Sequence, residues 1–334
     1  MKGKIIWIMI GIMIGIMVGV AAEAQEKRMA VVEFSTAYLR LKPDYESPLE
    51  TQELMGTVVE ITAEEGYWRE VVTPQPYKAW CTDQGLVEMT EEELKAYQEA
   101  PKVIYQELYG HIHTKPSAKS PTICDLVGGD VLRLADPGRE LRGKWTKVML
   151  PSGKTGYVPS KELKHHNGFV SIAMGEGSAK SISPEVTEAI IAQAERLIGV
   201  PYLWGGMSAK GVDCSGLVRI CHIMNGILLP RNASQQVKCG TRVEISRQAR
   251  DEKGEPTYDR EAALEATAGL ERGDLVFFGT PATDEKPMRI THVGIYLGSN
   301  RIIHSSHRVR VNSLIPGDAD YYENAHRLVA AIRL

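Results

Sequence analysis

Residues 201–218 read PYLWGGMSAKGVDCSGLV, and the amphipathic pattern that begins in this stretch predicts a helix from Cys214 to Met224. Asp213 occupies the position from which a carboxylate caps a helix N-terminus. Asn225-Gly226 follows as a stop signal. A thiol at a helix N-terminus lies near the positive end of the helix dipole, which favours the thiolate. The sequence therefore predicts that Cys214 is a nucleophile, which needs a neighbouring base.

Two downstream histidines are the candidate bases. His292 lies in THVGIYLG and His304 in RIIHSS, two runs that predict the strands of a hairpin around Gly298-Ser299-Asn300. A three-residue loop keeps residues of the same parity facing each other, so the even spacing places both imidazoles on one face. A two-residue loop would place them on opposite faces. From spacing alone, His292 is equally well a strand-end histidine and His304 a hydrogen-bonded core group.

The composition is that of an ordinary folded protein. Hydrophobic residues make up 43% of the 334 residues and charged residues 24%, which excludes a disordered chain, a collagen-like fibre and a polytopic membrane protein. The net charge of −3 lacks the basic excess of a nucleic-acid binder, so no such partner is expected. Lys2 and Lys4 precede an apolar run that ends near Ala22-Glu23-Ala24. This pattern predicts a signal peptide over residues 1–24, with a retained membrane anchor as the alternative, and an exported folded part.

Two regions of short strands, residues 28–90 and 101–165, resemble each other. Lys42-Pro43 followed by Ser47-Pro48 recurs as Lys115-Pro116 followed by Ser120-Pro121, and Gly66-Tyr67-Trp68 recurs as Gly143-Lys144-Trp145. The constant offset predicts a duplicated small β unit, and each unit resembles a bacterial SH3-like barrel. Trp68, Trp145 and Tyr157 are expected to belong to the barrel cores.

The rest of the chain has a different pattern. A helical piece over 90–100 joins the two β regions, with Thr90 and Glu93 placed as a capping box. Residues 166–182 predict a linker because their end is rich in Gly and Ser. Residues 183–334 switch to helices followed by strands, with Ser183 as the N-cap of the first helix.

The runs PYLWGGMSAKGVDCSGLV, LPRNASQQ, RGDLVFF, THVGIYLG and RIIHSS together strongly resemble the NlpC/P60 cysteine peptidases, over roughly residues 185–334. The resemblance implies an α+β fold with a papain-like catalytic domain behind the two barrels. It also implies that Cys214 is the nucleophile, His292 the base and His304 the residue that orients the base. Tyr202 is placed at the active site, whereas Trp204 is expected to pack in a wall.

Two SH3-like units before such a domain resemble the YkfC type of γ-D-glutamyl-L-diamino acid endopeptidase, the dipeptidyl-peptidase VI group. In that group the first barrel closes one end of the cleft and binds a free N-terminal L-Ala. The resemblance implies that the substrate is bound by Tyr202, Asp213, Ser215, Glu50, Tyr77 and Ser234. Asn232 stands where the family often has Asp, so the match at Ser234 depends on the alignment of that loop.

We therefore expect a hydrolase that cuts the γ-D-Glu–diamino acid bond of peptidoglycan stem peptides. Its partners would be muropeptides, its state a monomer, and membrane contact would arise only if the N-terminal segment is retained. No metal or organic cofactor is expected. The alternatives are an amidase or acyltransferase acting on another amide, and a non-catalytic scaffold that binds the wall. An occupied triad argues against the scaffold.

Overall fold

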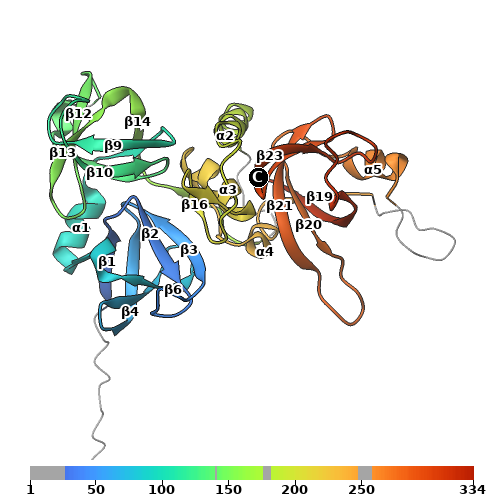
Figure 1. Ribbon diagram of the computed structural model, residues 1–334, viewed down its shortest axis with the longest axis horizontal. Helices are drawn as coiled ribbons and strands as arrows, with labels where there is room; N and C mark the ends of the chain where they lie inside the picture. The colour runs from blue at the N-terminus through green and yellow to red at the C-terminus, as the bar shows by residue number, and fades with distance from the viewer. Residues whose placement is uncertain (1–26, 140, 176–181, 247–257) are drawn as a thin grey trace, which may run out of the picture.

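The computed structural model describes residues 27–139, 141–175, 182–246 and 258–334 (Figure 1). The predicted signal segment, residues 1–24, lies outside these ranges. Within them, every helix is too short or too polar to cross a membrane. The described chain mixes helices with several sheets, as expected for an α+β fold.

The first unit is an antiparallel sheet of seven strands in the order β3-β2-β6-β5-β4-β1-β7 around a small apolar core. Alternating apolar and polar residues bury one face of strands such as β2. The elements of this unit are β1 (Arg28–Val32), β2 (Thr36–Arg40), β3 (Leu49–Leu54), β4 (Val58–Glu65), β5 (Trp68–Val72), β6 (Lys78–Thr82), η1 (Asp83–Gly85) and β7 (Leu86–Met89).

The second unit repeats this topology, as the duplicated sequence pattern predicted. Its order is β10-β9-β13-β12-β11-β8-β14, which is the first order with seven added to each strand number. Its elements are β8 (Lys102–Tyr105), β9 (Tyr109–His113), β10 (Thr122–Val127), β11 (Val131–Leu134), η2 (Pro137–Arg139), β12 (Trp145–Met149), β13 (Thr155–Pro159), η3 (Ser160–Glu162) and β14 (Leu163–His166). The helix α1 (Glu91–Glu99) joins the two sheets, and the capping box of Thr90 and Glu93 is confirmed.

The aromatic residues expected in the barrel cores behave differently from one another. Trp68 is buried beneath Tyr45 and Tyr67, with ring centroids 4.9 and 5.7 Å away. Trp145 and Tyr157 are only half-buried, so the prediction of core packing is wrong for them. The apolar core of the second sheet consists instead of smaller aliphatic residues and Tyr105.

The third unit contains a six-stranded sheet in the order β19-β24-β20-β21-β22-β23, with helices packed against it (Figure 1). The predicted Ser183 N-cap begins the first of these helices. The strands of this sheet are β19 (Thr241–Val243), β20 (Leu275–Thr280), β21 (Arg289–Gly298), β22 (Arg301–Ser306), β23 (Arg308–Ser313) and β24 (Leu328–Arg333). The helices are α2 (Pro184–Arg196), α3 (Cys214–Ile223), α4 (Ala233–Gln236), α5 (Arg260–Thr267) and the short η4 (Ala325–Arg327).

Two short strand pairs complete this unit. The pair β16 (Met207–Ser208) and β17 (Gly211–Val212) precedes α3, and β15 (Val170–Ser171) pairs in parallel with β18 (Ile227–Leu228). The β15 strand lies inside the predicted 166–182 linker, and Ile172 beside it is buried in the core that surrounds α3. The described residues of this segment therefore pack against the third unit, because burying their apolar side chains in its core is favourable.

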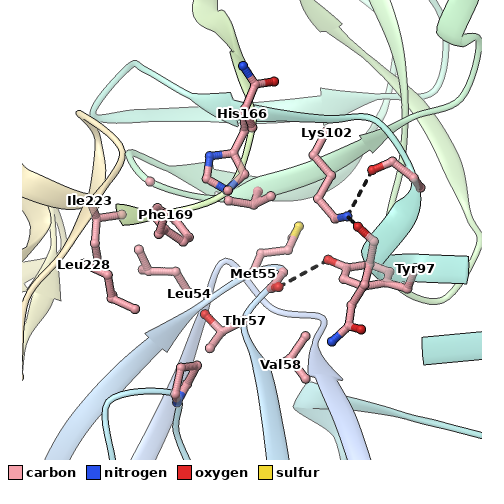
Figure 2. A pocket seen from close by; sticks show the side chains of 18 of the residues that line it. Leu54, Met55, Thr57, Val58, Tyr97, Lys102, His166, Phe169, Ile223 and Leu228 are labelled. Atoms are coloured by element: carbon pink, nitrogen blue, oxygen red, sulfur yellow. Dashed lines mark hydrogen bonds between the residues drawn. The ribbon is translucent and has the colours of Figure 1, made fainter. Parts of the chain in front are cut away.

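The three units meet around a cavity of about 960 Å³, whose lining includes Met55, Lys102, Phe169 and Ile223 (Figure 2). Lys102 Nζ bonds the carbonyls of Gln98 and Ala100 at the end of α1, at 2.8 and 3.0 Å. Neither the candidate nucleophile nor the two candidate histidines line this cavity. The junction therefore fixes how the units are placed and is separate from the candidate site.

Candidate active site

Cys214 is the first residue of α3, a helix in which every residue is buried. Asp213 caps the helix as predicted, because its Oδ1 accepts the Gly216 N–H at 2.7 Å. Oδ2 of the same carboxylate accepts the Gly205 N–H at 2.9 Å. One side chain thus holds both the helix start and the loop that precedes the nucleophile.

The hairpin that carries His292 and His304 places both imidazoles on one face, as predicted, but its turn differs from the predicted one. The loop between β21 and β22 contains only Ser299 and Asn300, both with left-handed φ values of 51° and 58°. The three-residue loop is therefore wrong. A register shift between Tyr296 and Gly298 adds one residue to β21 and restores the pairing of equal parity. The two imidazoles consequently share a face, as the spacing predicted.

The two imidazoles are directly hydrogen-bonded. His292 Nε2 lies 2.7 Å from His304 Nδ1, and His304 Nε2 lies 2.9 Å from Asn312 Oδ1 on β23. Tyr322 packs against both rings, with centroids 5.6 Å from His292 and 4.6 Å from His304. No sequence pattern pointed to Asn312, since a single polar residue in a strand is usually solvent-facing. Only the register of β22 against β23 places it beside His304.

Burial controls the electrostatics of this group. Desolvation, together with the negative charge of Asp213, raises the pKa of the Cys214 thiol to about 12, although backbone N–H groups at Val293 and Ser215 oppose the shift. Desolvation lowers the pKa of His292 to about 3 and that of His304 to about 4. Burial thus opposes the thiolate that the helix dipole favours, because taking a charge out of water costs free energy. Burial therefore favours the uncharged forms of the thiol and of both imidazoles.

A buried guanidinium that sequence reasoning missed lies beneath the nucleophile. Arg231 is 2% exposed, and its NH1 and NH2 groups bond the two oxygens of Asp213 at 3.1 and 2.5 Å. NH1 also donates to Ser215 Oγ at 2.9 Å. Arg231 stands in LPRNASQQ, and its place beside the cap could have been inferred only from the need of a buried carboxylate for a counter-charge.

The first unit supplies a strand to this site. Of the buried polar residues on β3, Thr51 accepts from Arg231 Nε at 2.7 Å and Gln52 accepts from the Met207 N–H at 2.8 Å. At the start of the same strand, Glu50 accepts a 2.6 Å hydrogen bond from the Tyr77 hydroxyl. The backbone of Glu50 lies so close to Gly205 that a Cβ there would stand 3.1 Å from it.

The remaining predicted site residues are placed as follows. Tyr202 is half-buried, and burial, followed by the charges of Cys214 and Asp213, raises the pKa of its hydroxyl. Ser215 is buried and donates to Asp213 Oδ1 at 3.2 Å. Ser234 is exposed on α4. Trp204 is 66% exposed, so the prediction that it packs in a wall is wrong.

Comparisons with known proteins match one domain to a family and most of the chain to two peptidases. Residues 199–327 match the model of the NlpC/P60 family. The chain is 28% identical to dipeptidyl-peptidase 6 of Lysinibacillus sphaericus over 91% of this chain and 98% of that protein. It is 29% identical to the gamma-D-glutamyl-L-lysine dipeptidyl-peptidase of Bacillus subtilis (strain 168), over 77% of this chain and 72% of that one.

A solved structure supports the fold. An NlpC/P60 family protein from Bacillus cereus superposes with a TM-score of 0.68, covering 91% of this chain and 99% of that one at 20% identity. The similarity thus extends over the β units as well as the third unit. Residues 199–327 form an NlpC/P60 domain, and this domain together with the dipeptidyl-peptidase relatives identifies the protein as a cysteine peptidase.

Proposed function

We propose that this peptidase hydrolyses the amide bond between γ-D-Glu and the diamino acid of peptidoglycan stem peptides that begin with a free L-Ala. The products are L-Ala-γ-D-Glu and the diamino acid with any remaining tail. The names of two relatives matched over most of their length, a dipeptidyl-peptidase 6 and a gamma-D-glutamyl-L-lysine dipeptidyl-peptidase, support this assignment.

In the proposed reaction Cys214 is the nucleophile, His292 the general base and His304 the group that orients it. Because burial favours the uncharged thiol and imidazole, His292 takes the thiol proton as sulfur attacks the carbonyl carbon. The C–N bond then breaks as the imidazolium returns that proton to the departing amine, and a thioester is left. Water, deprotonated by His292, hydrolyses the thioester and regenerates the thiol. The Cys214 N–H at the helix start is suited to stabilise the oxyanion.

The observation that carries the specificity is the Glu50–Tyr77 pair on the first unit, beside the loop that leads to the nucleophile. A partly buried carboxylate with one hydrogen bond is suited to a substrate ammonium, which needs an opposite charge when it leaves water. Asp213 is the other candidate carboxylate, and its charge is already met by Arg231. We therefore assign the amine to Glu50 and Tyr77.

The other predicted contacts follow from this assignment. Asp213 and Ser215 hold Arg231 in the buried part of the site and so support the loop and the helix start around the nucleophile. Tyr202, whose pKa is raised in part by Cys214, would contact the scissile group. Ser234, being exposed, would contact only the outer part of a longer peptide. A blocked cleft end would limit the enzyme to peptides already released from the wall, which implies a role in recycling by an exported protein.

The test is cleavage of L-Ala-γ-D-Glu-diaminopimelate with a free amine, beside the same peptide carrying an N-acetyl cap, by the chain from Gln25 onward. We expect cleavage of the free-amine peptide alone, and none by Cys214→Ala. Glu50→Gln should lower kcat/KM about 10- to 100-fold, the value of a hydrogen bond to a charged group. Glu46→Gln, a change at an exposed carboxylate of the same unit, is the matched control.

Two outcomes would contradict the proposal. Equal cleavage of both peptides would leave an endopeptidase without the ammonium pocket at Glu50 and Tyr77. Cleavage of neither peptide by a folded protein would reject the γ-D-glutamyl substrate and favour another amide.

A further inference from the structure

We propose that Asn312 is a positioning residue: its amide dictates which ring nitrogen of His292 carries the proton and so keeps that ring in the form a base needs. This inference rests on the proposed roles of Cys214 and His292. Asn312 would be the fourth residue in the series that runs from the nucleophile through the two histidines. It lies on β23, a strand that carries none of the three predicted catalytic residues.

The orientation of the Asn312 amide is set by a backbone carbonyl. Its Nδ2 lies 2.6 Å from the Asp320 carbonyl oxygen, which also accepts the Ser313 N–H at 3.1 Å. A carbonyl oxygen can only accept, so the amide nitrogen must face Asp320 and the amide oxygen must face His304. An ion pair between the Asp320 carboxylate and Arg301 fixes this loop in place. Asn312 itself is 6% exposed, so water does not compete for the amide.

The proton positions then follow one from another. Asn312 Oδ1 can only accept, so His304 carries its proton on Nε2. A neutral His304 then has a bare Nδ1, which accepts the proton on His292 Nε2 across 2.7 Å. His292 is therefore left with an unprotonated Nδ1. This is the nitrogen that can take the thiol proton.

Without the amide acceptor, the direction of these hydrogen bonds can reverse. His304 would place its proton on Nδ1 and donate it to His292 Nε2, which would force the His292 proton onto Nδ1. A His292 in that form has no lone pair for the thiol and cannot act as a base. In a Ser-His-Asp triad the wrong tautomer costs about 10⁴-fold in rate.

The charged and titratable groups around the pair do not fix the tautomers themselves. Arg310, opposite His304 on β23, lowers the pKa values of both imidazoles. Tyr322 lies against both rings, and Cys214 approaches from α3. None of these groups stands between His304 Nε2 and the Asn312 amide, which are within hydrogen-bond distance.

The test compares Asn312→Leu, which keeps the shape and loses the acceptor, with Asn312→Asp, which keeps an acceptor and adds charge. Ser313→Ala is the matched control, because it removes a partly buried 2.6 Å hydrogen bond to Asp318 from the next residue of the same strand. Each variant is assayed by the pH dependence of Cys214 alkylation with iodoacetamide, a readout that needs no peptide. The histidine tautomers of the full-length wild type and Asn312→Asp are read by long-range ¹H–¹⁵N NMR.

We expect Nε2–H on both wild-type rings. Asn312→Leu should slow alkylation at pH 7 about 100-fold, within the cost of a wrong tautomer, while Ser313→Ala changes it less than about threefold. Asn312→Asp should move the acid limb of the profile to higher pH by about one unit, because the added carboxylate favours protonated His304.

A proton on His292 Nδ1 in the wild type would overturn the proposal, as would an Asn312→Leu profile that matches that of Ser313→Ala. If Asn312→Leu does not fold, the wild-type tautomers and the Asn312→Asp shift still decide the question. Because alkylation does not depend on the substrate, a normal alkylation pattern with no peptide cleavage would reject only the proposed substrate.

Discussion

Replacing Arg219 with Met should destabilise the protein strongly, because it leaves a carboxylate buried without its partner. Arg219 lies on α3 and is 1% exposed, and its NH1 group is 3.2 Å from Oε1 of Glu53 on β3, which is 2% exposed. The pair joins the first unit to the helix that begins with the nucleophile. Met has a similar length and is apolar, so the change removes charge with little change of volume.

The size of the effect follows from the burial of both groups. Removing one member of a buried ion pair costs about 3–5 kcal/mol, since the remaining charge must stay unpaired or take up a proton. Replacing both with apolar residues is often close to neutral. We therefore expect Arg219→Met to lower the thermal midpoint by about 6–10 °C at about 2 °C per kcal/mol. The double variant with Glu53→Leu should recover most of this loss.

Differential scanning calorimetry on the full chain measures the midpoint and shows whether the units unfold together. The control is Arg272→Met, which breaks an exposed pair with Glu188 at 2.6 Å and should cost less than about 1 kcal/mol. If Arg219→Met matched this control, or if the double variant were as unstable as the single one, the argument from buried charge would be refuted.

Two further predictions concern the candidate site. The folded-state pKa values of His292 and His304 are depressed from 6.5 to about 3 and 4, so the unfolded chain binds more protons between pH 6.5 and 3 and stability should fall as the pH drops through this window. Urea denaturation at stepped pH measures the dependence of stability on pH, and His292→Gln should make that dependence shallower. A dependence unchanged by the substitution would refute the prediction. Gly205→Ala should lower stability and activity more than Gly226→Ala. Both glycines have left-handed φ values, 78° and 80°, but only at Gly205 would a new Cβ stand 3.1 Å from the Glu50 backbone. We expect about 1–3 kcal/mol of additional loss in the free energy of unfolding, and equal thermal midpoints for the two variants would show that the contact is loose.

Local sequence patterns predicted the helices and strands well where the residues that form the pattern all lie within one element. The Asp213 cap, the Thr90 capping box and the duplicated strand order all follow from short-range rules of capping and repeat spacing. The parity of His292 and His304 also held, although the turn that produces it was predicted wrongly. A bulge replaced the third loop residue, and single-residue bulges leave no clear pattern in a strand.

What the sequence could not predict depends on contacts between elements. Arg231 and Asn312 gain their roles from positions on segments far from Cys214 in the chain, so no spacing rule connects them. The pKa of the nucleophile is a second property of this kind. The helix dipole can be inferred from one segment, whereas burial of Cys214 depends on contacts of α3 with other elements, including β21. The charge state of Cys214 therefore depends on tertiary packing.

The strand β3 links substrate recognition to folding. Glu50, the proposed amine ligand, lies one residue before Thr51, which bonds Arg231, and three before Glu53, which bonds Arg219. A substitution that moves this strand would change the cleft end and the stability together. Loss of activity from such a change would then say little about amine binding. Because Glu50 is only partly buried whereas Thr51 and Glu53 are not exposed, Glu50→Gln can change the charge at the cleft while the buried pairs hold the strand in place. A change of specificity without a change of thermal midpoint in that variant would therefore report on recognition alone.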